Sequence, residues 1–133
     1  MTTIGTVTGA TGIGVRAVTE DGGGTYAEGN IQLFVADVNG GTTGIYANNR
    51  AYDSTGTMKV TATGTVTGAN GIGIHAINAA NSHGVGVPRL TIWAADVSGT
   101  SDGIRVEANR YETKLTSITA GSVIGTNQDG VDA

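Results

Sequence analysis

GTVTGANGIGIHA, residues 64–76, occurs a second time almost unchanged as GTVTGATGIGVRA, residues 5–17. The two copies are 59 residues apart, and looser copies begin at Ala36, Ala95 and Gly121. Five copies in 133 residues form an array. Because each unit of a repeat protein is stable mainly through contacts with its neighbours, the way the copies stack determines the fold.

One valine in each copy aligns the array, and successive valines are 31, 28, 31 and 26 residues apart. These anchors are Val7, Val38, Val66, Val97 and Val123. A glycine follows each anchor by two residues, and a second glycine follows after a short polar step. The predicted pairs are Gly9 and Gly12, Gly40 and Gly44, Gly68 and Gly71, Gly99 and Gly103, and Gly125 and Gly130. Since glycine adopts positive φ without a steric penalty, each pair predicts a tight turn.

Apolar and polar residues alternate on both sides of these turns, which is the pattern of β-strands. Before the turn, Val60, Ala62 and Val66 alternate with threonines; after it, Ile72, Ile74 and Ala76 alternate with polar residues or glycine. No segment has an apolar stripe at helical spacing. We therefore predict an all-β fold, a parallel β-helix or β-solenoid of about four to five rungs of about 26–32 residues in a 59-residue two-rung repeat, in one domain spanning residues 1–133. Right-handed crossovers are strongly preferred, so we expect a right-handed helix.

Composition and charge restrict the functional classes. A hydrophobic content of 38% is typical of a folded chain, and the 23 glycines fall at fixed places in the repeat instead of forming low-complexity sequence. A net charge of −4 without Lys/Arg clusters argues against binding nucleic acid or an anionic membrane. No stretch has the roughly 20 apolar residues of a membrane-spanning helix. Without cysteine, the chain forms no disulfide or zinc-thiolate site.

The connections after the second strand of each repeat vary in length, and variable loops are where solenoids commonly place contacts. They are predicted at residues 18–30, 48–57, 77–88 and 109–114. The repeat pattern continues to both ends of the sequence without a polar capping segment. The edge strands of an uncapped solenoid expose unpaired backbone N–H and C=O groups. We therefore expect either a piece of a longer array or end-to-end or lateral self-association.

Phe34 and Trp93 are the largest apolar residues of the array, and their orientation depends on the register. Counting in steps of two from the anchor valines points both rings into the core and turns Leu33, Val35 and Ile92 outward. The alternative is a β-bulge that turns both rings to the surface, where they would form a sugar-stacking pair.

The segments GTVTG, GIGIHA, TATGTVTG and ADVSGTSDGI resemble the repeat-rich passenger regions of bacterial autotransporter adhesins, especially alphaproteobacterial ones. The resemblance covers nearly the whole chain. It implies a right-handed parallel β-helix, secretion to the bacterial cell surface and an adhesive role. Its motifs specify architecture and carry no catalytic residue, and the signal peptide, translocator barrel and helix cap of that family are not in this sequence.

Asp37 and Asp96 are the acidic residues that most resemble the calcium ligands of pectin-lyase-like enzymes, which use a similar scaffold. They share a column with Thr6, Thr65 and Ser122, two rungs or roughly 10 Å apart. That separation is too large for a shared proton or a bidentate metal clamp, so we interpret them as solvated or turn-capping acids. The Asx-Gly pairs of the turns lack the regular spacing of calcium-binding repeats.

A second set of polar residues lies on the outward face of the strands that follow the turns. Arg16, Asn48, His75 and Glu107 are predicted to form one column, with Tyr46, Arg105 and Asp132 beside it. Glu107 has no acidic partner in that column and His75 has no nucleophile at a recognisable spacing, so neither a glycosidase pair nor a triad is supported. Charged and aromatic groups along a flat sheet suit a polar ligand. We predict weak binding of a glycan or a protein by Arg16, Tyr46, Asn48, His75, Arg105 and Glu107.

The sequence thus predicts a structural or adhesive module at the bacterial surface, without enzymatic activity, metal or cofactor. Its expected partners are a glycan, a host or cell-surface protein, or further copies of the chain. Two alternatives remain open: a β-helical protein that binds or degrades polysaccharide in the manner of a pectate lyase, and a self-assembling filament subunit.

Overall fold

The computed structural model describes residues 5–19, 30–49, 57–78, 89–108 and 115–133. Every regular element in these ranges is a β-strand, so none of them contains a helix that could cross a membrane. The strands are β1 (Val7–Gly9), β2 (Val15–Thr19), β3 (Ile31–Val35), β4 (Val38–Gly40), β5 (Ile45–Asn49), β6 (Met58–Gly68), β7 (Ile74–Asn78), β8 (Arg89–Gly99), β9 (Ile104–Ala108), β10 (Leu115–Gly125) and β11 (Val131–Asp132).

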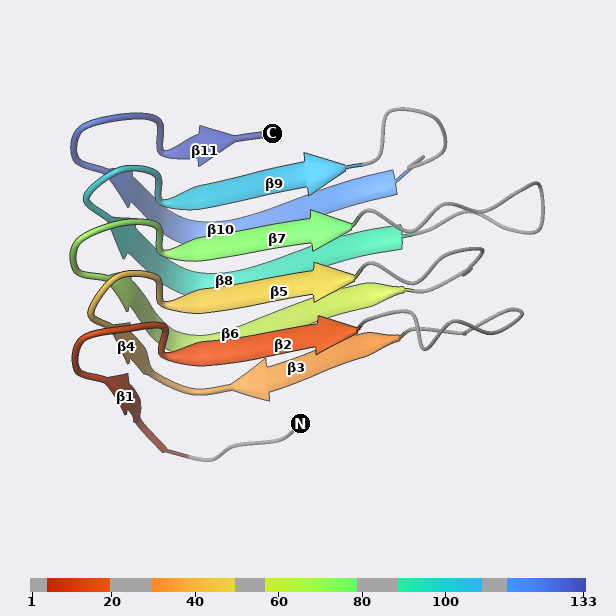
Figure 1. Ribbon diagram of the computed structural model, residues 1–133. Helices are drawn as coiled ribbons and strands as arrows, with labels where there is room; N and C mark the ends of the chain where they lie inside the picture. Colours follow the sequence, from red (N-terminus) through yellow and green to blue (C-terminus); the bar gives the residue numbers. More distant parts are fainter. Residues whose placement is uncertain (1–4, 20–29, 50–56, 79–88, 109–114) are drawn as a thin grey trace.

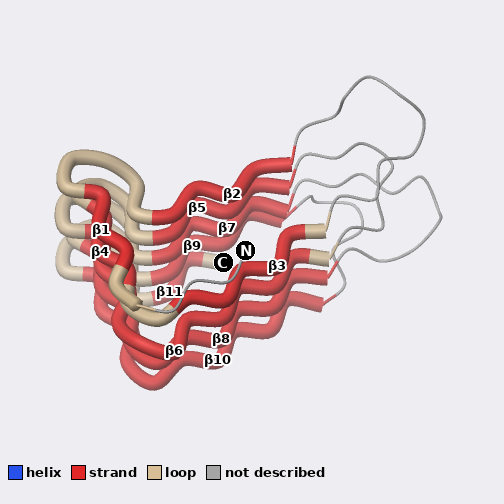
Figure 2. Tube along the Cα trace, turned by 90° about the horizontal axis from the view of Figure 1, so that it is seen from below, coloured by secondary structure: helices blue, strands red, loops and turns tan. Residues whose placement is uncertain are grey.

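The strands form two parallel sheets that share one core (Figure 1). In the first, which we call sheet A, the order is β1-β4-β6-β8-β10, and β3 also pairs with β6. In the second, sheet B, the order is β11-β9-β7-β5-β2. The chain alternates between the sheets, and each pass lies on the previous one, so the all-β parallel solenoid is confirmed. Seen along the stack, the passes superimpose (Figure 2).

The anchor valines form one continuous ladder through sheet A. Val7 pairs with Val38, Val38 with Val66, Val66 with Val97 and Val97 with Val123. The glycines two residues later follow the same register from Gly9 to Gly125. Val38, Val66 and Val97 are fully or almost fully buried. The register predicted from the valines is therefore confirmed.

The second glycine column differs from the prediction in two repeats. Sheet B begins one residue after Gly14, Gly44, Gly73, Gly103 and Gly130, because Val15, Ile45, Ile74, Ile104 and Val131 pair in register. Gly12 and Gly71, predicted for this column, lie within their turns. The segments Gly12-Ile-Gly14 and Gly71-Ile-Gly73 each offer two glycines, and the prediction took the earlier one.

Most of the described turn glycines are required by close packing, and none of them by positive φ. Gly5 is the only described glycine with positive φ, at 122°, and it lies outside the turns. At Gly73, an added Cβ would lie 2.5 Å from the backbone oxygen of Gly103 and 2.5 Å from a methyl group of Val97. Successive levels therefore approach too closely at this column for any side chain.

Sheet A bends sharply part-way along each long strand, and the bend changes which residues face inward (Figure 2). Two residues separate the buried Ala94 from the buried Val97 in β8, whereas three separate Ala62 from Val66 in β6. The register between the two strands accordingly shifts between Ala62 and Thr65. β6 thus carries one extra residue at the bend, as in a β-bulge.

The predicted orientation of Phe34 and Trp93 is wrong. Phe34 is 45% exposed and Trp93 43% exposed, whereas Leu33, Val35 and Ile92 are buried. Counting in twos from the valine does not hold across the bend, and a shift of one residue transfers every side chain to the opposite face. Both rings face the surface, as in the alternative, but the two-residue bend in their own part of sheet A turns them outward, and not the extra residue of β6.

The core is a set of stacked small and medium aliphatic side chains, with no aromatic residue among the buried ones described. Leu33, Val60 and Ile92 stack in one column and Ile45, Ile74 and Ile104 in another. The first two residues of the connections predicted at 18–30, 48–57 and 77–88 extend β2, β5 and β7. Residues 20–29, 50–56, 79–88 and 109–114 of the predicted loops lie outside the described residues.

Candidate functional site

The outward face of sheet B carries a ladder of charged and aromatic side chains, one from each level. Arg16 pairs with Tyr46, Tyr46 with His75, His75 with Arg105 and Arg105 with Asp132. We call this column the outer ladder: Arg16, Tyr46, His75, Arg105 and Asp132. Inward neighbours on the same strands, such as Ile45 and Ile74, are completely buried.

The predicted single column of Arg16, Asn48, His75 and Glu107 is wrong. Asn48 pairs with Val18 and Ile77, and Ile77 pairs with Glu107, so Asn48 and Glu107 belong to a second column two residues further along the strands. The error has the same origin as the misplaced glycines, because the residue equivalent to Ile45 is Val15 and not Ile13. The structure nevertheless places all six predicted binding residues on the outer side of sheet B, although Asn48 is almost fully buried there.

Contacts join the first half of the outer ladder. The guanidinium carbon of Arg16 lies 5.9 Å from the ring centre of Tyr46, within the range of a cation–π contact. The Tyr46 and His75 rings meet edge to face, with centroids 5.4 Å apart and planes at 78°. The Asn48 side-chain amide donates a hydrogen bond of 2.8 Å to the Tyr46 hydroxyl. Tyr46 is therefore held on three sides.

Ionic contacts continue the ladder beyond His75. Nε2 of His75 lies 2.9 Å from Oε1 of Glu107. Because a carboxylate can only accept, Nε2 is the nitrogen that carries the hydrogen. Nε of Arg105 lies 3.3 Å from Oε1 of Glu107 and 3.7 Å from Oδ2 of Asp132, but its geometry gives no hydrogen bond to a described residue. These Arg105 contacts are thus electrostatic.

Asp102 approaches the ladder from the turn before β9. Its side chain is almost fully buried, and its Oδ2 lies 3.9 Å from a terminal nitrogen of Arg105 without a hydrogen-bond partner in the described part of the chain. Arg105 is consequently surrounded by three carboxylates, those of Asp102, Glu107 and Asp132. The outer ladder is positive at Arg16 and mixed in sign at its other end.

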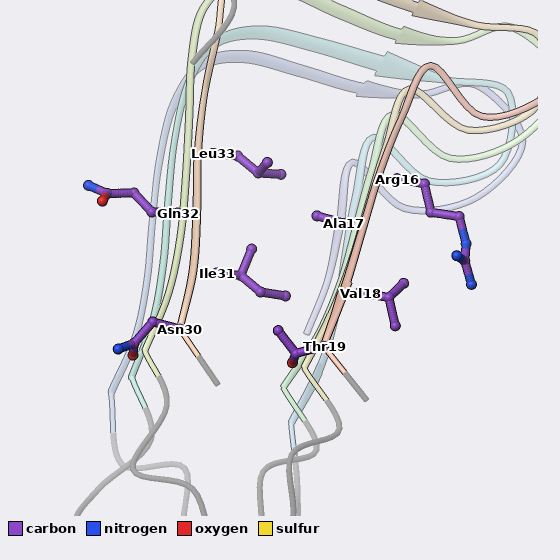
Figure 3. A pocket seen from close by; sticks show the side chains of 8 residues that line it. All are labelled: Arg16, Ala17, Val18, Thr19, Asn30, Ile31, Gln32 and Leu33. Carbon is purple, nitrogen blue, oxygen red and sulfur yellow. The ribbon is translucent and has the colours of Figure 1, made fainter. Parts of the chain in front are cut away.

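The inward side of sheet B ends in polar residues. Thr19, Asn49 and Asn78 pair in register, both asparagines are fully buried, and the Thr19 hydroxyl donates a 2.6 Å hydrogen bond to Oδ1 of Asn49. Beside Thr19, a hollow of about 330 Å³ opens between β2 and β3. Ile31, Leu33, Ala17 and Thr19 point across it, whereas Arg16 points away (Figure 3). This hollow is the end of the core and is separate from the outer ladder.

Asp37 and Asp96 have the structural role that the sequence indicates for them. Oδ1 of Asp37 accepts a 2.8 Å hydrogen bond from the backbone amide of Thr65 at the bend of the next level. Asp96 pairs with Thr65 on one side and Ser122 on the other, so the two acids are two levels apart, as predicted. Within the described ranges, no group of three or more His, Cys, Asp or Glu residues is arranged to hold a metal ion.

Comparisons with known proteins give no match, whether with family models, with curated proteins or with solved structures. The outer ladder must therefore be interpreted from its own chemistry. It offers hydrogen-bond donors, hydrogen-bond acceptors and two aromatic rings on successive levels of one sheet. Such a surface is suited to binding a polar partner, since its groups are already held in place.

Proposed function

We propose that the protein is a structural and adhesive surface module that contacts a protein on a cell surface through the outer ladder of sheet B. The resemblance to autotransporter passenger repeats supports the adhesive role and a location outside the cell. The parallel solenoid is the architecture expected of such a module, because stacked levels produce a stiff body with a long flat face.

One observation carries the proposal: on the outward face of sheet B, Arg16 contacts Tyr46 and Tyr46 contacts His75, while Glu107 connects His75 to Arg105. Tyrosine and arginine are enriched at the centres of protein–protein interfaces, where a few such residues provide most of the binding energy. Arg16, Tyr46 and Arg105 supply these residue types within one column. Tyr46 is held by Arg16, His75 and Asn48, and Arg105 by its carboxylate neighbours, so less side-chain entropy is lost when a partner binds.

Charge further supports a protein partner over a glycan at this face. Arg16 is exposed at one end, while Glu107 and Asp132 are about half exposed at the other. A protein surface provides both signs of charge, and complementary charges fix the orientation of the bound partner. A neutral glycan has no charged groups to pair with either end.

The test is adhesion of beads coated with the protein to intact cells. Changing Arg16→Ala, His75→Ala and Arg105→Ala together is expected to weaken adhesion at least about tenfold. The matched control is Asp96→Ala with Ile124→Ala, which also truncates exposed side chains, but on sheet A and outside the outer ladder. Circular dichroism establishes that all variants retain the fold.

Pretreating the cells separates the partner classes. Protease treatment should abolish adhesion, and glycosidase treatment should leave it unchanged. If glycosidase abolishes adhesion while protease does not, the ladder binds a glycan and the protein-partner proposal is wrong. If the wild type and the triple variant with Arg16→Ala, His75→Ala and Arg105→Ala adhere equally, the outer ladder does not contribute to adhesion.

A further inference from the structure

The outward face of sheet A, before the bend, contains a second cluster that the outer ladder does not explain. Phe34, Thr61 and Trp93 occupy one column on three successive levels, because Phe34 pairs with Thr61 and Thr61 with Trp93. Both rings are nearly half exposed. As strands in a sheet are about 4.8 Å apart, the rings lie roughly 10 Å apart along the solenoid axis.

Positive charge flanks this aromatic column. Lys59 is exposed on the same face and the same strand as Thr61, two residues earlier, so it stands beside the space between the rings. Arg89 is exposed on the strand of Trp93, at an outward position four residues earlier. We call these five residues the aromatic–cationic face: Phe34, Lys59, Thr61, Arg89 and Trp93.

No acidic residue occupies the outward positions before the bend within the described strands. The acids closest in sequence to the rings, Asp37 and Asp96, lie within the bend, and Asp37 is engaged with the Thr65 amide. Thr91, Ser117 and Thr119 occupy further outward positions of this half and are polar. This half of sheet A is locally cationic although the whole chain has a net charge of −4.

We propose that the aromatic–cationic face binds a linear acidic polysaccharide, one that carries uronate or sulfate groups, lying along the solenoid axis. The apolar faces of two sugar units would stack on the rings of Phe34 and Trp93. An aromatic ring offers a large apolar contact area in this arrangement. Lys59 and Arg89 would pair with the acidic groups, and the hydroxyl of Thr61 would hydrogen-bond between the rings. Charge complementarity selects this occupant over a neutral glycan or an apolar protein segment.

The experiment uses Trp93 itself as the reporter, because it is the only tryptophan of the chain. Tryptophan fluorescence is titrated with oligogalacturonate and, separately, with a neutral β-glucan of the same length. We expect the acidic oligomer to shift the emission and the neutral one to bind at least about tenfold more weakly. Raising the salt concentration should weaken the acidic complex, since surface charge pairs are screened by salt.

Variants identify the contacts. Phe34→Ala and Lys59→Gln should each raise the apparent Kd for oligogalacturonate at least about fivefold, because each removes one of few anchors. Two controls match them: Ile124→Ala removes an exposed apolar side chain from sheet A beyond the bend, and Arg16→Gln removes a charge from sheet B. Neither control should change the Kd.

Three results would overturn the proposal. The first is equal binding of the neutral and acidic oligomers, and the second is a Kd that Phe34→Ala and Lys59→Gln leave unchanged. The third is a concentration-dependent dimer in sedimentation that Trp93→Ala abolishes, which would make this face a contact between copies of the chain. Because the residues differ from those of the outer ladder, none of these results depends on the proposed adhesive function.

Discussion

Residues 5–17 and 64–76 have almost the same sequence but lie in different surroundings. Val66 and Ala76 are completely buried, whereas Val7 and Ala17 are partly exposed. The strands of the second stretch, β6 and β7, have partners on both sides, while β1 and β2 each pair with one described strand. Burial in this fold is thus provided by the levels above and below more than by the sequence of the repeat itself.

Replacing the equivalent valines should give the largest difference between the two stretches. Val66→Ala removes two buried methyl groups and leaves a cavity, so we expect it to lower the free energy of unfolding by about 2–3 kcal/mol. Val7→Ala, at the partly exposed edge, should lower it by less than about 1 kcal/mol. Urea denaturation followed by circular dichroism measures both. Equal losses would mean that the edge level is as tightly packed as the middle.

Glycines at equivalent turn positions should differ by a smaller amount. A Cβ at Gly71 would lie 2.8 Å from the backbone oxygen of Thr42 in the neighbouring turn, whereas a Cβ at Gly12 meets nothing within 4 Å. We expect Gly71→Ala to destabilise by about 1–2 kcal/mol and Gly12→Ala to be neutral or slightly stabilising. Paired thermal melts of the two variants provide the measurement, and a Gly12→Ala variant that melts lower than Gly71→Ala would contradict this interpretation.

The smallest difference is expected on the surface, at Arg16 and His75. His75→Ala loses the contact with Glu107 and the edge-to-face contact with Tyr46, which together contribute about 0.5–1 kcal/mol. Arg16→Ala loses only its contact with the Tyr46 ring, worth less than about 0.5 kcal/mol at an exposed site. A double-mutant cycle of His75→Ala with Glu107→Gln isolates the ionic part, and a coupling energy of zero would show that the pair does not stabilise the fold.

The repeat pattern was sufficient to predict the architecture and the valine ladder. Both depend on residues that recur in every copy, and a parallel stack places equivalent residues on top of one another. The register of Val38 with Val66 and Val97 is a direct result of that recurrence. The six residues predicted for binding also share a face, since sheet B is straight and alternation holds along its short strands.

The errors arose where the number of residues between equivalent positions changes. Sheet A passes through a bend of two or three residues, and counting across it reversed the orientation of Phe34 and Trp93. A local signal was present: Ile31, Leu33 and Val35 alternate by themselves, which already assigns Phe34 to the outside. The number of residues in the turn also differs by one between levels. Counting from the first isoleucine after each turn therefore placed Asn48 and Glu107 in one column with Arg16 and His75, although they lie two residues further along the strands. The particular contacts of the ladder, such as His75 with Glu107, could not be predicted because they depend on side-chain conformation.

That variation in the turn has a regular form. The step from the first to the second turn glycine is five residues from Gly9 to Gly14 and from Gly68 to Gly73, but four from Gly40 to Gly44 and from Gly99 to Gly103. The true period of the molecule is therefore a pair of levels, and Phe34 and Trp93 occur once in each pair. Lengthening the array by a whole pair of levels would add one more ring to the aromatic column at the same interval. Adding a single level would break the alternation between aromatic and threonine positions in that column.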